Sequence, residues 1–238
     1  MLEQVKILTS RRAYEFSPDA LRLSSLSIQP VQHQIQQLFN FQSSAIGTPI
    51  ATFGEVPSTF PPGIVFNIGA WIHQEEHIVP VRFLHFEQNR IVIDIAGPTV
   101  AIDGIADRLF HFLSGLRAAD GSEVVGEPVR ILDYSEITAQ FSYPLDTLFA
   151  RPLRRIFSKM VSRGVDDLSM TLVPIIGIQA FPSDEVLPGM QITNDPRAFT
   201  FSLRSGTRPE ENIYFSTAPL DSEAHLAYLE HLATSLKP

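Results

Sequence analysis

The run Val5-Lys6-Ile7-Leu8, close to the start of the chain, recurs as Val129-Arg130-Ile131-Leu132, 124 positions later. Runs rich in Val, Ile and Leu are typical of β-strands, and both runs are interpreted as the first strand of a unit. A proline-containing stop follows each of them, at Phe16-Ser17-Pro18 and at Phe141-Ser142-Tyr143-Pro144. The same pattern, an apolar run followed by a proline-containing stop, therefore begins twice in the chain, near residues 5 and 129.

Working outward from these two strands, we expect the same order of elements in each half: a helix, three or so strands and a closing helix. Helices are predicted from apolar residues three and four positions apart, and strands from short β-rich runs. An Ile-Gly pair stands in register in both halves, at Ile68-Gly69 and at Ile176-Gly177. The elements are expected at residues 30–42, 64–70, 81–86, 91–95 and 102–116 in the first half, and at 153–161, 172–178, 199–203, 213–216 and 226–236 in the second.

This order predicts an α+β fold made by tandem duplication of a strand–helix–strands–helix unit. We expect an antiparallel sheet with helices packed on one face and a pseudo-twofold axis between the halves. Residues 1–118 form the first repeat and 119–238 the second, with a polar connector at about 117–128, and the repeats pack as one globular unit. The alternative is that the likeness is generic, because α+β proteins often alternate such elements.

The composition excludes several classes of chemistry. The 238 residues are 44% hydrophobic, enough to bury a sizeable core, and they include no cysteine. Disulfides, thiolate nucleophiles and Cys-ligated zinc are therefore excluded. A net charge of −8 disfavours broad contact with nucleic-acid phosphates. No signal peptide and no run of eighteen apolar residues is found, so we expect no membrane contact and a cytoplasmic location.

One motif resembles a zinc site. His73-Gln74-Glu75-Glu76-His77 matches H-x-x-E-H, in which two histidines one helical turn apart bind zinc. The runs on both sides are β-rich, and on a strand two residues four apart are separated by about 13 Å, too far for one metal ion. We therefore expect a polar hairpin turn and no metal site.

The strongest charge feature is a cluster of basic residues in the helix expected near residue 155. Its basic residues occupy the side opposite the apolar stripe, and no acidic residue interrupts them. A solvated surface is one interpretation, and contact with an anionic partner is the other. The residues are Arg151, Arg154, Arg155, Lys159 and Arg163.

A second group of polar residues lies in the hairpin expected at 81–95. His85 and Glu87 share one face of a strand and could pair as a base and its orienting carboxylate, or simply face solvent. Asp94 is a carboxylate inside an apolar strand, where an unpaired charge is costly. Together with Arg82 they are the candidate residues for a pocket between the two halves.

The first functional hypothesis is a non-enzymatic binding or regulatory protein that presents the duplicated sheet and its loops to a protein partner. The alternative is a small-molecule-binding protein or enzyme with its pocket between the halves. A third hypothesis is a nucleic-acid partner held by the helix around Arg155. No nucleotide-binding glycine loop or nucleophile elbow occurs, so we predict no cofactor and no catalytic residue. The oligomeric state stays open.

Overall fold

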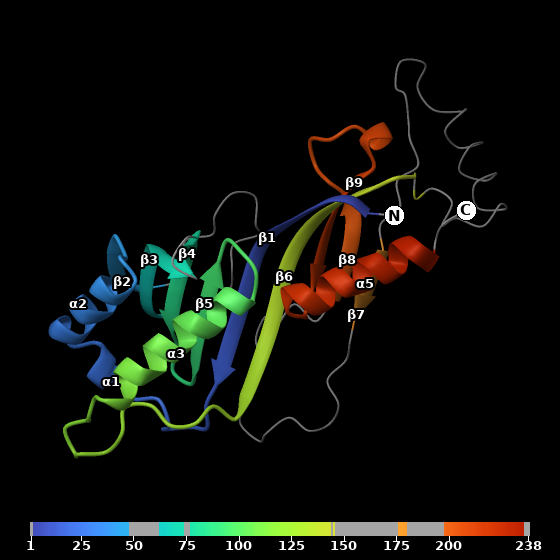
Figure 1. The fold of residues 1–238 in the computed structure, drawn as a ribbon. Helices are drawn as coiled ribbons and strands as arrows, with labels where there is room; N and C mark the ends of the chain where they lie inside the picture. The colour runs from blue at the N-terminus through green and yellow to red at the C-terminus, as the bar shows by residue number, and fades with distance from the viewer. Residues whose placement is uncertain are drawn as a thin grey trace, which may run out of the picture.

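The computed structural model describes residues 2–47, 62–73, 77–143, 145, 176–179 and 198–235. Within these ranges the fold is α+β, and Figure 1 shows its elements. In chain order they are β1 (Leu2–Glu15), α1 (Leu23–Leu26), α2 (Gln29–Leu38), β2 (Ser43–Gly47), β3 (Gly63–His73), β4 (His77–Phe86), β5 (Arg90–Ile95), α3 (Val100–Ser114), β6 (Arg130–Phe141), β7 (Ile176–Gln179), β8 (Ala198–Leu203), the 3₁₀ turn η2 (Pro209–Glu211), β9 (Ile213–Ala218) and α5 (Ser222–Ser235).

All described strands belong to a single antiparallel sheet in the order β2-β3-β4-β5-β1-β6-β9-β8-β7. The two long strands that open the halves, β1 and β6, lie side by side at its centre (Figure 1). Ser10 of β1 pairs with Ser135 of β6 in their register. The prediction of an antiparallel sheet with helices is confirmed. None of the described helices has the length and apolar character needed to span a membrane.

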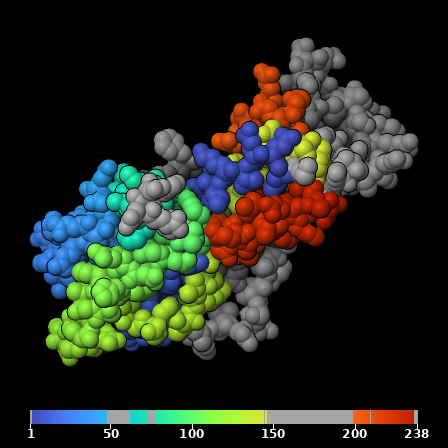
Figure 2. Space-filling model, viewed as in Figure 1, coloured from blue at the N-terminus to red at the C-terminus, as the bar shows by residue number. Residues whose placement is uncertain are grey.

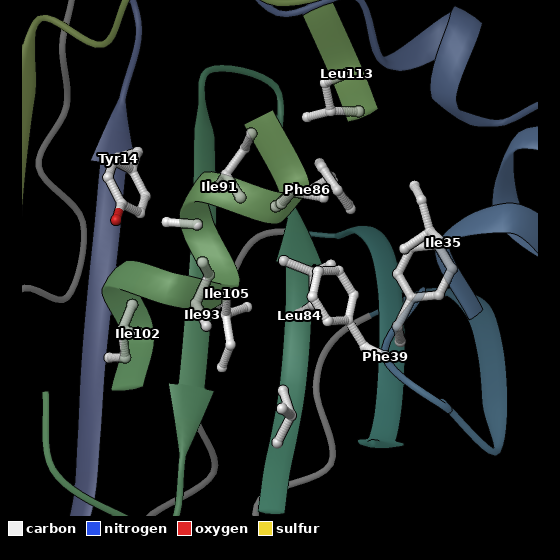
Figure 3. Close-up of a cluster of buried hydrophobic side chains, with 14 of the residues drawn as sticks. Tyr14, Ile35, Phe39, Leu84, Phe86, Ile91, Ile93, Ile102, Ile105 and Leu113 are labelled. Atoms are coloured by element: carbon white, nitrogen blue, oxygen red, sulfur yellow. The ribbon is translucent and has the colours of Figure 1, made fainter. Parts of the chain in front are cut away.

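The main core lies between the sheet and the helices α1 to α3. Strict alternation along β5 directs Ile91, Ile93 and Ile95 towards α3 and leaves Asp94 on the second face. The helical spacing predicted for residues 102–116 is confirmed, because one stripe of α3 is buried against these isoleucines. Figure 3 shows Ile102, Ile105 and Leu113 of that stripe beside the strand side chains.

A second core cluster lies between α5 and the strands β6, β8 and β9. Phe141 packs edge-on against Phe201 and Tyr214, whose rings stack with centroids 4.8 Å apart. Leu229 of α5 is fully buried in the same cluster. In Figure 2 both α3 and α5 lie on the face of the molecule that is turned to the viewer.

The N-termini of the two long helices, α3 and α5, are linked by a pair of reciprocal hydrogen bonds, which we call the Thr99–Ser222 joint. The backbone N–H of Thr99 donates to Ser222 Oγ, and the backbone N–H of Ser222 donates to Thr99 Oγ1, both at 2.8 Å. Both residues are buried, and a buried N–H group at a helix terminus is destabilising when it has no acceptor. These two bonds supply the acceptors. Asp221 caps α5 by accepting a bond from Ala224 N at 2.7 Å.

The structure also differs from the expected elements. The helix expected at residues 30–42 is α2, which ends at Leu38 and is followed by the edge strand β2. The expected helix at 153–161 lies outside the described residues. The connector 117–128 is packed against the first core cluster, where it contributes the buried residues Val124 and Val125.

Candidate binding surface on the second face of the sheet

The second face of the sheet, opposite α3, carries buried charges. Across four neighbouring strands, the register places Phe83, Asp94, Arg11 and Tyr134 in one row. Arg11 Nε donates to Asp94 Oδ2 at 2.7 Å, and its guanidinium lies 5.5 Å from the centroid of the Phe83 ring and 5.4 Å from that of Tyr134. A guanidinium between two aromatic rings gains cation–π stabilisation in addition to the ion pair.

Asp94 is the centre of this cluster. It is fully buried, and Arg82 Nε lies 3.3 Å from its second oxygen, Oδ1. Arg82 in turn donates to Thr9 Oγ1 at 2.6 Å. The two guanidinium groups offset the cost of burying this carboxylate. Sequence reasoning selected Arg82 and Asp94 together, and the structure joins them in an ion pair.

A second ionic group lies further along the same face. His85 Nδ1 is 3.3 Å from Glu87 Oε1, and Arg90 holds the same carboxylate through two bonds of 2.8 and 3.1 Å. His85 and Glu87 are both buried, so the structure does not place them as a solvent-facing pair. Beside them Glu15 lies 3.7 Å from Arg130. These groups form a second ionic cluster, which lies beside the Asp94 cluster on the same face of the sheet.

The basic cluster predicted from the sequence lies outside the described residues. Its members are Arg151, Arg154, Arg155, Lys159 and Arg163.

The two histidines of the H-x-x-E-H motif lie on neighbouring strands, and residues 74–76 between them lie outside the described residues. His73 is the last residue of β3 and His77 the first of β4, and the two are paired across the antiparallel ladder. The prediction of β-structure on both sides of the motif is confirmed. The zinc-binding helix that the motif would require is therefore absent from these two positions.

An apolar strip covers the second face at the end of the β3–β4 hairpin. Trp71 and Val79 pack on the core side, so the residues that alternate with them point the other way. Three isoleucines in this region are largely exposed: Ile68 at 60%, Ile72 at 61% and Ile78 at 71%. Ile72 and Ile78 are direct cross-strand partners, as are Ala70 and Pro80 next to them. We call Ile68, Ala70, Ile72, Ile78 and Pro80 the hairpin strip.

The hairpin strip contains no charged side chain. Single exposed apolar residues are ordinary on protein surfaces, whereas contiguous apolar patches mark interaction sites. The backbone beneath it is irregular, since Ile68 has a positive φ of 55°. A β-branched residue in that conformation is a true outlier, and such strain concentrates at functional sites. The sequence did not reveal the strip, because the strand pattern alone does not say which face is covered.

A buried histidine network in the other half was also missed. His225 is fully buried on α5, with Nδ1 2.8 Å from Ser135 Oγ and Nε2 2.8 Å from Ser216 Oγ. The serine hydroxyls also lie within bonding distance of the carbonyls of Leu220 and Thr200. Burial lowers the pKa of His225 to about 4. The available signal was its place on the apolar stripe of the helix, four residues before Leu229.

The histidine network predicts a specific loss of stability in acid. The pKa of His225 is lower in the folded chain than the usual 6.5, so folding favours the neutral ring. Its contribution is complete above pH 6.5 and is lost as the pH falls towards 4, by about 3 kcal/mol in total. Urea unfolding at pH 7 and pH 4.5 should show a larger loss for the wild type than for His225→Gln, which does not titrate. Equal losses would contradict the assignment.

No protein-family model matches the chain, and no curated protein is significantly similar to it. The function is therefore inferred from the surfaces and contacts described above.

Proposed function

We propose that the chain is a non-enzymatic binding protein that presents the second face of its sheet to a protein partner, with the hairpin strip as the contact. The exposure of three neighbouring isoleucines on one face supports this proposal. The partner is expected to contribute a short apolar segment, because the strip offers no charge to pair with. A protein without cysteine suits a reducing compartment, and we propose that it acts in the cytoplasm.

The small size of the strip favours a segment of another protein over a second copy of the chain. A standard interface uses roughly 20 to 30 residues on each side, and the strip has five. A strip of this size is the apolar centre of an interface, where a few residues account for most of the binding energy. The buried ionic clusters nearby are expected to hold the strands rigid beneath it.

We further propose that the chain is a tandem duplication. The strand order outward from β1 is β5, β4, β3, and outward from β6 it is β9, β8, β7, so corresponding strands occupy corresponding places. Ser10 donates to the Gly97 carbonyl at 2.7 Å, and its partner Ser135 donates to the Leu220 carbonyl at 2.8 Å. The Thr99–Ser222 joint has the same reciprocal character. These matches support a pseudo-twofold axis between β1 and β6.

The proposed contact can be tested by crosslinking followed by reconstitution. A photo-crosslinking amino acid at Ile78 should capture a protein in the cells that produce the chain, and one at Ile131, another exposed isoleucine, should not. The captured protein is then purified, and its affinity is measured for the wild type and for the double variant Ile72→Glu, Ile78→Glu. Burying charge in an apolar contact should weaken binding by about a hundredfold or more.

The matched control is Val129→Glu, Ile131→Glu, which replaces two exposed apolar residues and adds the same charge outside the strip. It should leave the affinity unchanged. Equal weakening by the strip variant and the control, or no weakening by the strip variant, would contradict the proposed contact. If the captured protein is a second copy of the chain, the strip mediates self-association. That result would also contradict the proposal.

A further inference from the structure

A cavity of about 480 Å³ lies between α3 and the connector 117–128, on the helix side of the sheet. Figure 1 shows this connector running past the end of α3. The size falls within the range of small-molecule sites. Neither the hairpin strip nor the ionic clusters of the second face contribute to it. Its described lining residues are Tyr14, Asp103, Ala106, Asp107, Phe110, Ser114, Glu123, Val125, Gly126, Glu127 and Pro128.

The inner wall of the cavity is aromatic and apolar. Tyr14 and Phe110 meet edge to face with centroids 5.0 Å apart, and Val125 is buried beside them. Tyr14 stands at the margin of the buried cluster in Figure 3, and it is almost fully buried. Burial raises the pKa of its phenol, so the ring remains neutral at pH 7. Such a wall can hold a hydrocarbon body and can stabilise a cation against an aromatic ring.

The rim of the cavity is acidic, and two of its four carboxylates have no ion-pair partner within the described ranges. Asp103 is bound by Arg12, and Glu123 lies 3.9 Å from Arg117. Asp107 and Glu127 form no ion pair with any residue in the described part of the chain. The described lining includes no basic side chain. The cavity therefore combines an apolar wall with two carboxylates available for a positive charge.

We propose that this cavity binds a small organic dication, with its hydrocarbon body against Tyr14 and Phe110 and its charged ends at Asp107 and Glu127. An inorganic cation fits less well, because hard cations need several oxygen ligands and two of the four lining carboxylates are already held by Arg12 and Arg117. No group of three or more metal-ligating side chains occurs among the residues that the structure describes. The binding site is independent of the proposed protein contact on the opposite face.

Calorimetric titration at low ionic strength tests the site, with agmatine as the probe. Agmatine carries a guanidinium, an ammonium and a short hydrocarbon chain between them. The wild type should bind it, and added salt should weaken binding because the carboxylates are exposed. The double variant Asp107→Asn, Glu127→Gln should lose about tenfold or more in affinity. The control Glu210→Gln, Glu230→Gln removes two exposed carboxylates of the second half and should bind as the wild type does.

The aromatic wall has its own test. Phe110→Leu keeps an apolar side chain but removes the ring, and it should weaken agmatine binding while Asp107 and Glu127 remain. Thermal unfolding of each variant confirms that it is folded before titration. Failure of the wild type to bind agmatine would overturn the proposal, as would equal binding of neutral butylurea. A further contradicting result is that equimolar Mg²⁺ displaces agmatine from the wild type but has no such effect on the double carboxylate variant. The cavity would then be a metal-ion site.

Discussion

Replacing Asp94 by alanine is expected to destabilise the protein by about 3–5 kcal/mol, the range seen when one partner of a buried ion pair is removed. The Asp94 carboxylate is fully buried, and it accepts a bond from Arg11 at 2.7 Å while Arg82 lies at 3.3 Å. Without it, two guanidinium groups remain next to each other on a face with little access to water. Equilibrium unfolding in urea at pH 7 measures the effect.

The control for Asp94 is an exposed carboxylate in an equally direct ion pair. Asp103 pairs with Arg12, but its side chain is 55% exposed. Asp103→Ala should therefore cost less than about 1 kcal/mol. Similar losses for the two variants would mean that the Asp94 cluster is solvated, and the interpretation of the second face as a buried ionic layer would be wrong.

The second large effect is expected in the core under α5. Phe201 is fully buried and contacts Phe141 and Tyr214 through its ring. Phe201→Ala should cost about 3–5 kcal/mol, because it removes a large buried side chain and leaves a cavity. The measurement is again urea unfolding, followed by circular dichroism and by tryptophan fluorescence.

Fluorescence makes this variant a test of the whole sheet. The chain has a single tryptophan, Trp71, which packs against the first core cluster, far along the sheet from Phe201. If the continuous sheet unfolds cooperatively, the Trp71 transition should move by the same free energy as the circular dichroism transition. A Trp71 transition that stays in place while the dichroism shifts would show that the two halves unfold separately.

Much of the sheet follows from local sequence patterns. The repeated runs at residues 5–8 and 129–132 predict the two central strands, and the structure places them in β1 and at the start of β6. The closing helices α3 and α5 are also predicted from local patterns. Apolar residues at helical spacing place one stripe of each helix against the sheet. Alternating strands also identify Asp94 as unusual before its two arginine partners are known.

The missed features depend on contacts between distant residues. The strand β2 has the sequence Ser-Ser-Ala-Ile-Gly, which lacks a strand pattern and is held by pairing with β3. His225 satisfies its ring nitrogens through Ser135 and Ser216, which come from two different strands. The hairpin strip depends on which side of β3 the helix α3 covers. Sequence periodicity gives two faces for a strand and does not assign the buried one.

Hydrogen exchange on the reconstituted complex tests the proposed function most directly. The partner captured through Ile78 is added at saturation, and amide protection is compared with that of the chain alone. The proposal predicts new protection in peptides covering residues 68–73 and 77–80, with no change in α5. Protection restricted to other segments, with the hairpin strip exchanging as fast as in the free protein, would contradict it.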